Sequence, residues 1–162
     1  MAFDMFMKLK GIDGEAKDKT HEKEIDVLAW SWGMTQSGSF EVGGGGGSGK
    51  VNVQDLSFTK YIDISSPVLM LNCSNGDPLD DATLTVRKAG KTPFEYLIIK
   101  MEKVLVTSVS TGGSGGEDRL TENVTLNFAK VEVTYKEQDD KGGEKSKKTY
   151  KWNIETNDGD CS

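Results

Sequence analysis

The stretch Glu95–Thr111 reads EYLIIKMEKVLVTSVST, which is too long and too apolar for a strand with one face in water. Apolar side chains occupy both alternating sets of positions: Leu97, Ile99, Met101 and Leu105 in one set, and Tyr96, Ile98, Val104 and Val106 in the other. Successive side chains of a strand point to opposite faces. We therefore expect both faces to be covered by a helix, a second sheet or a neighbouring subunit.

Alternation of apolar and polar residues, which is typical of half-buried strands, extends on both sides of this stretch. It sets Leu28, Trp30 and Trp32 on one face of a strand, which we interpret as the core face. Three further segments alternate in the same way: residues 3–9, 83–87 and 150–155. The chain is therefore predicted to be mostly β.

Two strands change the parity of their apolar positions partway along. Val51 and Val53 are followed by Leu56, Phe58 and Ile62, and Val124, Leu126 and Phe128 are followed by Val131, Val133 and Tyr135. A one-residue shift sends side chains to the opposite face, so each change predicts a β-bulge or a change of buried face. We place these changes near Gln54–Asp55 and Ala129–Lys130. Such bends are common where a sheet curls into a barrel.

A single segment has helical character. Ser66-Pro67 resembles an N-cap followed by proline at the first helical position, and Gly76 fits the end of the helix. A helix of this length is not stable alone. We expect it to pack on the sheets through an apolar surface formed by Val68, Leu69, Met70, Leu71 and Cys73.

Glycines mark the loops, at residues 43–49 and 112–116. The polar segment Asp139–Lys148 is expected to connect the last two strands as a hairpin with Gly142-Gly143 at its tip. There is no internal repeat and no linker that would divide the chain. Residues 1–162 are therefore predicted to form a single domain.

The charge balance narrows the class of partner. The 162 residues carry 20 basic and 26 acidic side chains, a net charge of −6. Such a chain has no basic surface that would attract nucleic acid.

No run approaches the roughly 18 to 20 apolar residues of a membrane span. The N-terminus, MAFDMFMKLKG, lacks the features of a signal peptide, so we expect a cytoplasmic protein unless a signal-independent machine exports it. Cys73 and Cys161 are expected to form neither a disulfide nor a metal site.

Three blocks make the chain similar to a known family. They are THEKEIDVLAWSWG (Thr20–Gly33), GKVNVQDLSFTKYID (Gly49–Asp63) and STGGSGGEDRLTENVTLNF (Ser110–Phe128). In this order and at these spacings they resemble the Hcp family, the haemolysin-coregulated proteins of type VI secretion systems. The resemblance extends from Met1 to about Asn157 and is weakest in Asn75–Asp81, Asp139–Lys148 and the C-terminal tail.

The resemblance implies a compact β-barrel built from two sheets with one short α-helix, assembling into a homo-hexameric ring. It also implies a structural role: rings stack into the inner tube of the secretion system, and the lumen can carry effector proteins. The implied partners are other copies of the chain, the spike at the tube tip, the sheath, the baseplate and exported effectors. Export by the type VI machine then needs no signal peptide.

Three features that resemble nucleotide-binding, catalytic or metal-binding motifs are better explained as ordinary loop and surface residues. Gly44–Lys50 approaches a phosphate-binding loop, but Val51 replaces the hydroxyl residue and a strand follows instead of a helix. His21 lies among charged residues without a catalytic or zinc constellation, which favours an exposed position. The adjacent carboxylate pairs lack the spacing of a calcium loop. We therefore predict no catalytic, cofactor or metal site, and no enzyme.

Several residues are candidates for contacts in the assembly. Because Ser31 lies opposite the tryptophan face, it is a candidate for the lumen wall. In Ser37–Gly49, Phe40 and Val42 precede a glycine run whose ordering costs much backbone entropy, so this loop is expected to dock on another subunit or ring. A second candidate contact loop contains Gly113, Ser114 and Gly115. Glu117, Asp118 and Arg119 form a candidate salt bridge, within a subunit or between subunits.

The main alternative is a free-standing β-barrel that binds a small ligand or a glycan. Such a module would be monomeric or dimeric and would contain a closed pocket with convergent polar groups. A tube subunit would form a wide ring instead. An effector enzyme fused to a tube domain is disfavoured because no residues remain for a second domain.

Overall fold

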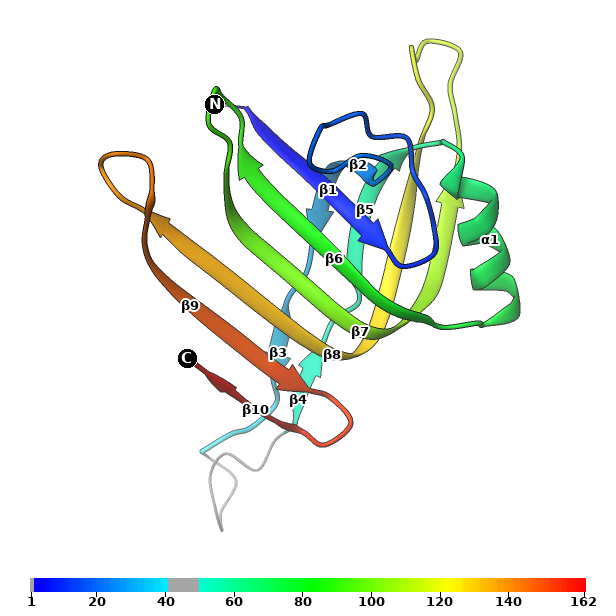
Figure 1. Ribbon diagram of the computed structural model, residues 1–162. Helices are drawn as coiled ribbons and strands as arrows, with labels where there is room; N and C mark the ends of the chain where they lie inside the picture. Colours follow the sequence, from blue (N-terminus) through cyan, green and yellow to red (C-terminus); the bar gives the residue numbers. More distant parts are fainter. Residues whose placement is uncertain (1, 41–49) are drawn as a thin grey trace.

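The computed structural model describes residues 2–40 and 50–162, and within them it has ten strands and one helix (Figure 1). Val42 and the glycine run at 43–49 lie outside the described residues. The elements in chain order are β1 (Phe3–Leu9), β2 (Ile25–Ser31), β3 (Met34–Gln36), β4 (Val51–Val53), β5 (Leu56–Tyr61), α1 (Ser65–Asn75), β6 (Leu79–Lys88), β7 (Phe94–Thr111), β8 (Thr121–Gln138), β9 (Glu144–Asn153) and β10 (Asp158–Cys161).

Six strands close into an antiparallel barrel in the order β8-β5-β2-β1-β6-β7, and β7 pairs back onto β8. β9 and β10 extend the sheet sideways from the C-terminal half of β8, while β3 and β4 form a separate two-stranded ribbon. The predicted mostly-β barrel with a short helix is confirmed. The hairpin between β8 and β9 is also confirmed, with Gly142 in the left-handed region at its tip (φ 90°).

The two longest strands, β7 and β8, each bury one face over half their length and the opposite face over the other half. In β8 the buried set changes from even to odd positions between Phe128 and Val131, as predicted. In β7 it changes from Met101 to Val104, across Lys103, whose backbone has φ 54°. The expectation that Glu95–Thr111 is apolar on both faces was therefore wrong. Ile99 and Met101 are buried before Lys103, and Val104 and Val106 are buried after it, while Leu105 is 36% exposed on the outer face.

The core face predicted for β2 is only partly correct. In β2 a register irregularity between Val27 and Ala29 changes the phase, so Leu28 is 39% exposed and only Trp30 packs against the core from this strand's second half. Trp32, just beyond the strand, is half-buried against the core.

At Gln54–Asp55 the less exposed positions change from odd in β4 to even in β5, as predicted. The cause is not a bulge. The chain leaves one sheet for another, because β4 pairs with β3 and β5 pairs with β2 and β8.

Helix α1 ends at Gly76 as predicted, with φ 72° and its N–H donating to the carbonyl of Asn72. It begins one residue before the predicted N-cap, and the observed cap residue is Ile64. Contrary to prediction, most of its apolar side chains do not pack on the barrel. Leu69 is fully buried, whereas Val68 and Met70 are each 40% exposed and Leu71 is 60% exposed. No helix in the described part of the chain is long and apolar enough to cross a membrane.

A buried ionic network joins the start of α1 to the barrel. Lys60 on β5 is fully buried, and its Nζ lies 2.7 Å from Glu122 Oε2 on β8 and 3.0 Å from Asp63 Oδ1. The hydroxyl of Ser66, in the first turn of α1, donates to Glu122 Oε2 (2.7 Å) and accepts from Lys60 (3.1 Å). Since Ser66 makes these bonds inside the helix, it acts as an anchor of the first turn rather than as its cap.

Removing Lys60 should be costly, because it leaves the buried carboxylates of Glu122 and Asp63 without their cation. We expect Lys60→Met to destabilise the protein by about 3–5 kcal/mol. The double variant Lys60→Met/Glu122→Leu should recover part of this loss, since it also removes the charge of Glu122, while Asp63 keeps its hydrogen bonds from Ser65. Thermal unfolding at matched protein concentration checks both. A double variant as unstable as Lys60→Met would contradict the role assigned to the charges.

Candidate functional site

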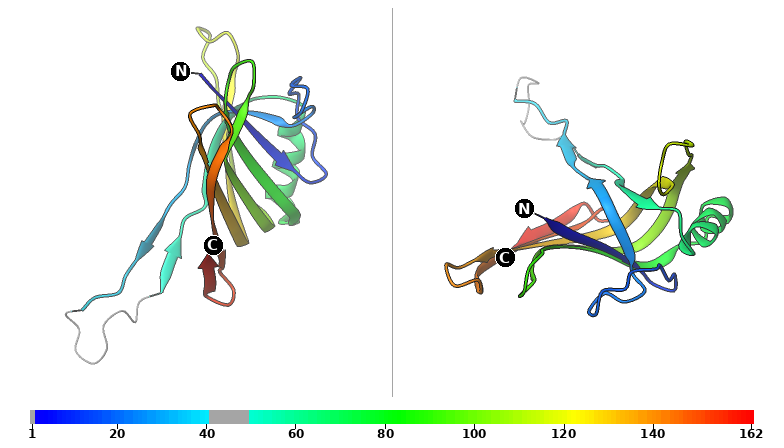
Figure 2. Two further views of the ribbon diagram at one scale, coloured as in Figure 1. Left: turned by 60° about the vertical axis from the view of Figure 1, so that its left-hand side comes forward. Right: turned by 90° about the horizontal axis from the view of Figure 1, so that it is seen from above.

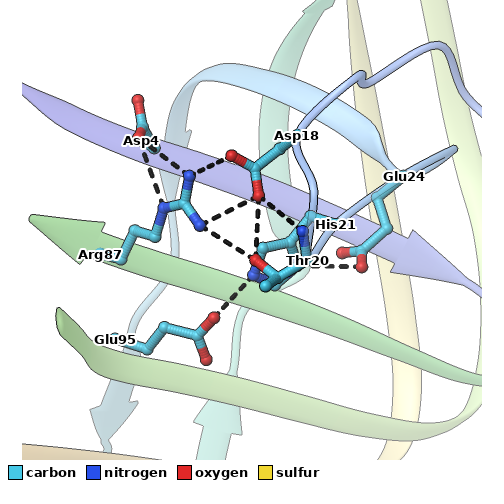
Figure 3. A network of polar contacts seen from close by, with 7 residues as sticks. All are labelled: Asp4, Asp18, Thr20, His21, Glu24, Arg87 and Glu95. Carbon is cyan, nitrogen blue, oxygen red and sulfur yellow. Dashed lines mark hydrogen bonds and ion pairs between the residues drawn. The ribbon is translucent and has the colours of Figure 1, made fainter. Parts of the chain in front are cut away.

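The loop between β1 and β2 is fastened to the outer face of the sheet by Arg87 on β6 (Figure 3). Its guanidinium is buried and donates from Nη1 and Nη2 to the carboxylate of Asp18, and from Nε (3.3 Å) and Nη2 (3.2 Å) to Asp4 on β1. Nη1 also donates to Thr20 Oγ1 at 3.1 Å. These hydrogen bonds hold the pKa of Asp18 well below its usual range, and the pKa of Arg87 is raised.

His21 lies in the same network, and its expected exposure was wrong: it is 8% exposed. Its ring stacks on Phe6 with centroids 4.4 Å apart and planes at 9°. Nδ1 lies 2.9 Å from Glu24 Oε2, and Nε2 lies 2.7 Å from Glu95 Oε1 on β7. Both carboxylates accept hydrogen bonds, so both contacts are satisfied together when the imidazole carries a proton on each nitrogen.

The network is an anchor for a loop, and its geometry offers no evident chemistry. It contains acids and bases but places no nucleophile against the His21 ring, both of whose nitrogens are engaged by carboxylates. No group of three or more His, Cys, Asp and Glu side chains is arranged to hold a metal within residues 2–40 and 50–162. These contacts could not be predicted from the sequence, because Arg87 follows Thr83 and Thr85 at alternate positions, as a solvent-facing residue would.

The bends in β7 and β8 divide the barrel into two walls with different outer faces. The polar wall consists of β2, β5, the N-terminal half of β8 and the C-terminal half of β7. Ser31 lies on its outer face beside Ser57, opposite the half-buried Trp30, as predicted. Most side chains on this face are small, uncharged and polar: Ser31, Ser57, Thr59, Ser108, Ser110, Asn123 and Thr125. Asp55, which accepts hydrogen bonds from Thr107 and Asn127, and Leu105, which is 36% exposed, also lie on it.

The charged wall consists of β1, β6, the N-terminal half of β7, the C-terminal half of β8, and β9. On its outer face opposite charges lie side by side on neighbouring strands: Lys100 is opposite Glu132, which is opposite Lys151, and Glu102 is opposite Lys130. These side chains line a shallow hollow of about 290 Å³. Cross-strand ion pairs of this kind are favourable but weak at an exposed surface.

The two predicted contact loops lie at opposite ends of the barrel (Figures 1 and 2). At one end the ribbon of β3 and β4 projects away from the barrel, and Phe40 beyond it is 94% exposed. At the other end Gly113, Ser114 and Gly115 lie in the exposed loop between β7 and β8. Val42, the second predicted anchor, lies outside the described residues.

Arg119 lies in the loop between β7 and β8. It does not pair with Glu117 or Asp118 in the described part of the subunit. Its guanidinium stacks on Tyr61, 3.7 Å from the ring centroid, which is a cation–π contact. Arg119 and Tyr61 line a polar hollow of about 390 Å³ together with Glu15, Lys17 and Asp26. Glu117 and Asp118 are exposed. A salt bridge from these residues to a neighbouring subunit stays a prediction.

Comparisons with known proteins agree on one family. The family model described as "Type VI secretion system effector, Hcp" matches residues 6–135. The chain is 64% identical over 159 residues to "Protein hcp1" of Pseudomonas aeruginosa, covering 97% of this chain and 98% of that protein.

Solved structures give the same result. The structure of a type six secretion system protein has a TM-score of 0.91 at 31% identity, covering 98% of this chain and all of the other. The crystal structure of Hcp1 from Salmonella typhimurium has a TM-score of 0.78 at 34% identity, covering 99% of this chain and all of the other.

The attachment of the loop to Arg87 should depend on pH. Asp18 titrates near 3.8 in the unfolded chain and lower in the folded protein, so its contribution is complete above that pH and is lost on further acidification. We expect wild type to be more stable than Asp18→Asn at neutral pH, and the difference to vanish as pH falls well below 3.8. Urea unfolding across pH measures this. Asp13→Asn, an exposed carboxylate in the same loop, should show no such difference, and an equal difference there would contradict the assignment.

Proposed function

Because the chain belongs to the Hcp family of type VI secretion proteins, we propose that it is a structural subunit of the inner tube of that system. Six copies close into a ring, rings stack into a tube, and the lumen carries effector proteins outward. The chain contributes walls and contact loops rather than catalysis. Its further partners are the tube-tip spike, the sheath and the baseplate, and it leaves the cell through the secretion machine without a signal peptide.

The observation that carries this proposal is the chemistry of the polar wall. Six copies of a face built from serine, threonine and asparagine side chains, with Ser31 among them, give a channel that is wetted but carries little charge. Such a surface offers a passing protein weak hydrogen bonds and neither a strong field nor an apolar patch to adhere to. The charged wall, with its paired lysines and glutamates, then faces away from the lumen.

Stacking of rings is supported by the ends of the barrel. The β3–β4 ribbon projects at one end, and two-stranded ribbons are only marginally stable alone. An apolar side chain such as Phe40, 94% exposed beyond that ribbon, is expected to gain burial from a neighbouring ring. We place the loop with Gly113, Ser114 and Gly115 at the face of the ring that receives it, because the two segments lie at opposite ends.

The alternative, a free-standing barrel that binds a small ligand, has weaker support. Within the described part of the chain, the barrel interior is occupied by a cluster of fully or nearly fully buried apolar side chains such as Phe58, Leu126 and Met101. The two hollows described above lie on outer surfaces and are lined mainly by charged side chains. A ligand site is usually enclosed and largely apolar.

The oligomeric state tests the proposal directly. We expect native mass spectrometry of the purified protein at micromolar concentration to give six times the subunit mass of 17.7 kDa. Light scattering provides an independent check. A stable monomer in both measurements would refute the tube proposal and would favour the free-standing barrel.

Changing the polar wall should affect transport without affecting assembly. Ser31→Arg places six bulky cations on the proposed lumen, so we expect intact rings but a severalfold loss of effector export, measured by the effector found outside the cell. Thr83→Arg is the matched control, because Thr83 is a mid-strand hydroxyl residue on the outer face of the charged wall, opposite Lys100. Equal effects of the two substitutions would show that Ser31 does not face the channel.

A further inference from the structure

One unpaired carboxylate, that of Asp55, interrupts the neutral middle of the polar wall. Asp55 is half-buried and lies two residues before Ser57, which pairs with Ser31. The other acid on this face, Asp26, lies at the start of β2 in the same hollow as Arg119. Among the described residues Asp55 forms no ion pair. It therefore brings to the wall a charge that no described cation neutralises by direct contact.

Two strands hold the carboxylate of Asp55 in place. Thr107 Oγ1 on β7 donates to its Oδ2 at 2.8 Å, and Asn127 Nδ2 on β8 donates to its Oδ1 at 2.9 Å. The hydroxyl of Thr125 lies 2.6 Å from Thr107 Oγ1 and can donate to it, which leaves the proton of Thr107 for the carboxylate. The carboxylate is thus positioned before any partner arrives.

Local departures from regular strand pairing bring these groups together. β7 has one extra residue, Thr107, in its register against β8. Bulges of this kind redirect a side chain and are frequent beside functional sites. Just before Asp55 the chain leaves the β3–β4 ribbon, and there Trp32 Nε1 donates to the carbonyl of Gln54 at 2.9 Å. Two separate irregularities therefore converge on one carboxylate.

The acceptor sites left on Asp55 match a guanidinium. A carboxylate offers about four acceptor sites, two on each oxygen, and here each oxygen accepts one of the hydrogen bonds described. One site on each oxygen remains, which suits the paired N–H donors of arginine. Leu105, opposite Asn127 on the same face and 36% exposed, provides an apolar surface for the stem of such a side chain.

A purely structural clip between strands is the alternative role for Asp55. Its two donors, Thr107 and Asn127, are neutral, so an amide oxygen would satisfy them as well as a carboxylate. The clip needs the hydrogen bonds but not the charge. The charge is the feature that indicates a cationic partner.

We propose that Asp55 is a specificity-determining residue of the lumen, where it binds an arginine side chain of the protein being carried. The proposal rests on the tube assembly and on the lumen position of the polar wall proposed above. A six-membered ring presents six such carboxylates at one level of the channel, so a carried protein with several surface arginines contacts more than one of them. Each contact is exposed and therefore weak, which is compatible with release of the cargo.

A pair of peptides tests the contact on the assembled protein. One is a fluorescent peptide with several arginines separated by glycines, and the other has citrulline, a neutral isostere, in place of each arginine. By fluorescence anisotropy at low salt, we expect Asp55→Asn rings to bind the arginine peptide roughly two- to fivefold more weakly than wild type. Binding of the citrulline peptide should not differ between the two proteins.

The matched control is Asp158→Asn, which removes the same charge from an exposed position on β10, outside the polar wall. We expect it to bind the arginine peptide as wild type does. Thr107→Val keeps the charge of Asp55 and removes one of its hydrogen bonds, so it should also weaken binding of the arginine peptide. Wild-type binding by Thr107→Val would overturn the positioning role of Thr107.

Native mass spectrometry and circular dichroism of each variant make the outcomes distinct. Hexameric wild type with equal binding of the arginine peptide by wild type and Asp55→Asn would overturn the proposed contact and leave the tube proposal standing. Equal losses in Asp55→Asn and Asp158→Asn would overturn it in the same way. Monomeric wild type would instead refute the tube proposal. If Asp55→Asn does not fold, Thr107→Val provides the test with the charge in place.

Discussion

The simultaneous bend in β7 and β8 is the constraint on which the rest of the structure depends. The buried face of each strand changes at the same level, between the cross-strand pairs Glu102–Lys130 and Val104–Phe128. A left-handed backbone at a non-glycine residue costs about 1–2 kcal/mol. The bend lets one continuous pair of strands line both walls of the barrel. Side chains from both halves of β7 and β8 therefore pack into a single core, and this packing offsets the cost of the bend.

The bend also gives the molecule two outer surfaces with different chemistry. One wall presents hydroxyl and amide groups, and the other presents alternating lysine and glutamate. Because β8 continues past the bend and pairs with β9, the charged wall is wider than the barrel it covers. Its inner face therefore carries apolar side chains that the described part of the chain leaves partly exposed, such as Tyr135, which is 51% exposed.

Most of the strands, the end of α1 and the bend in β8 were predicted, because each leaves a local pattern. The short strands β3 and β10 were not predicted, since their residues show no alternation of apolar and polar side chains. The bend in β7 was missed because Lys103 changes the parity within one continuous strand. Apolar residues then occupy both parities, which looks the same as a strand apolar on both faces. The buried position of His21 could not be predicted, because its partner Glu95 is 74 residues away. One signal was available and unused: Lys60 and Glu122 each occupy a buried parity in their strand, which indicates an internal ion pair.

The internal ion pair matters more for geometry than for stability. Buried pairs contribute little net stability, and their best-attested use is to specify one arrangement over others. Here Lys60, Glu122 and Ser66 fix where the first turn of α1 lies on the barrel, and Glu15 Oε2 accepts the N–H of Ile64 immediately before the helix. A helix held by apolar packing alone could shift along its contact surface. Directional bonds at the first turn hold α1 at one place on the barrel.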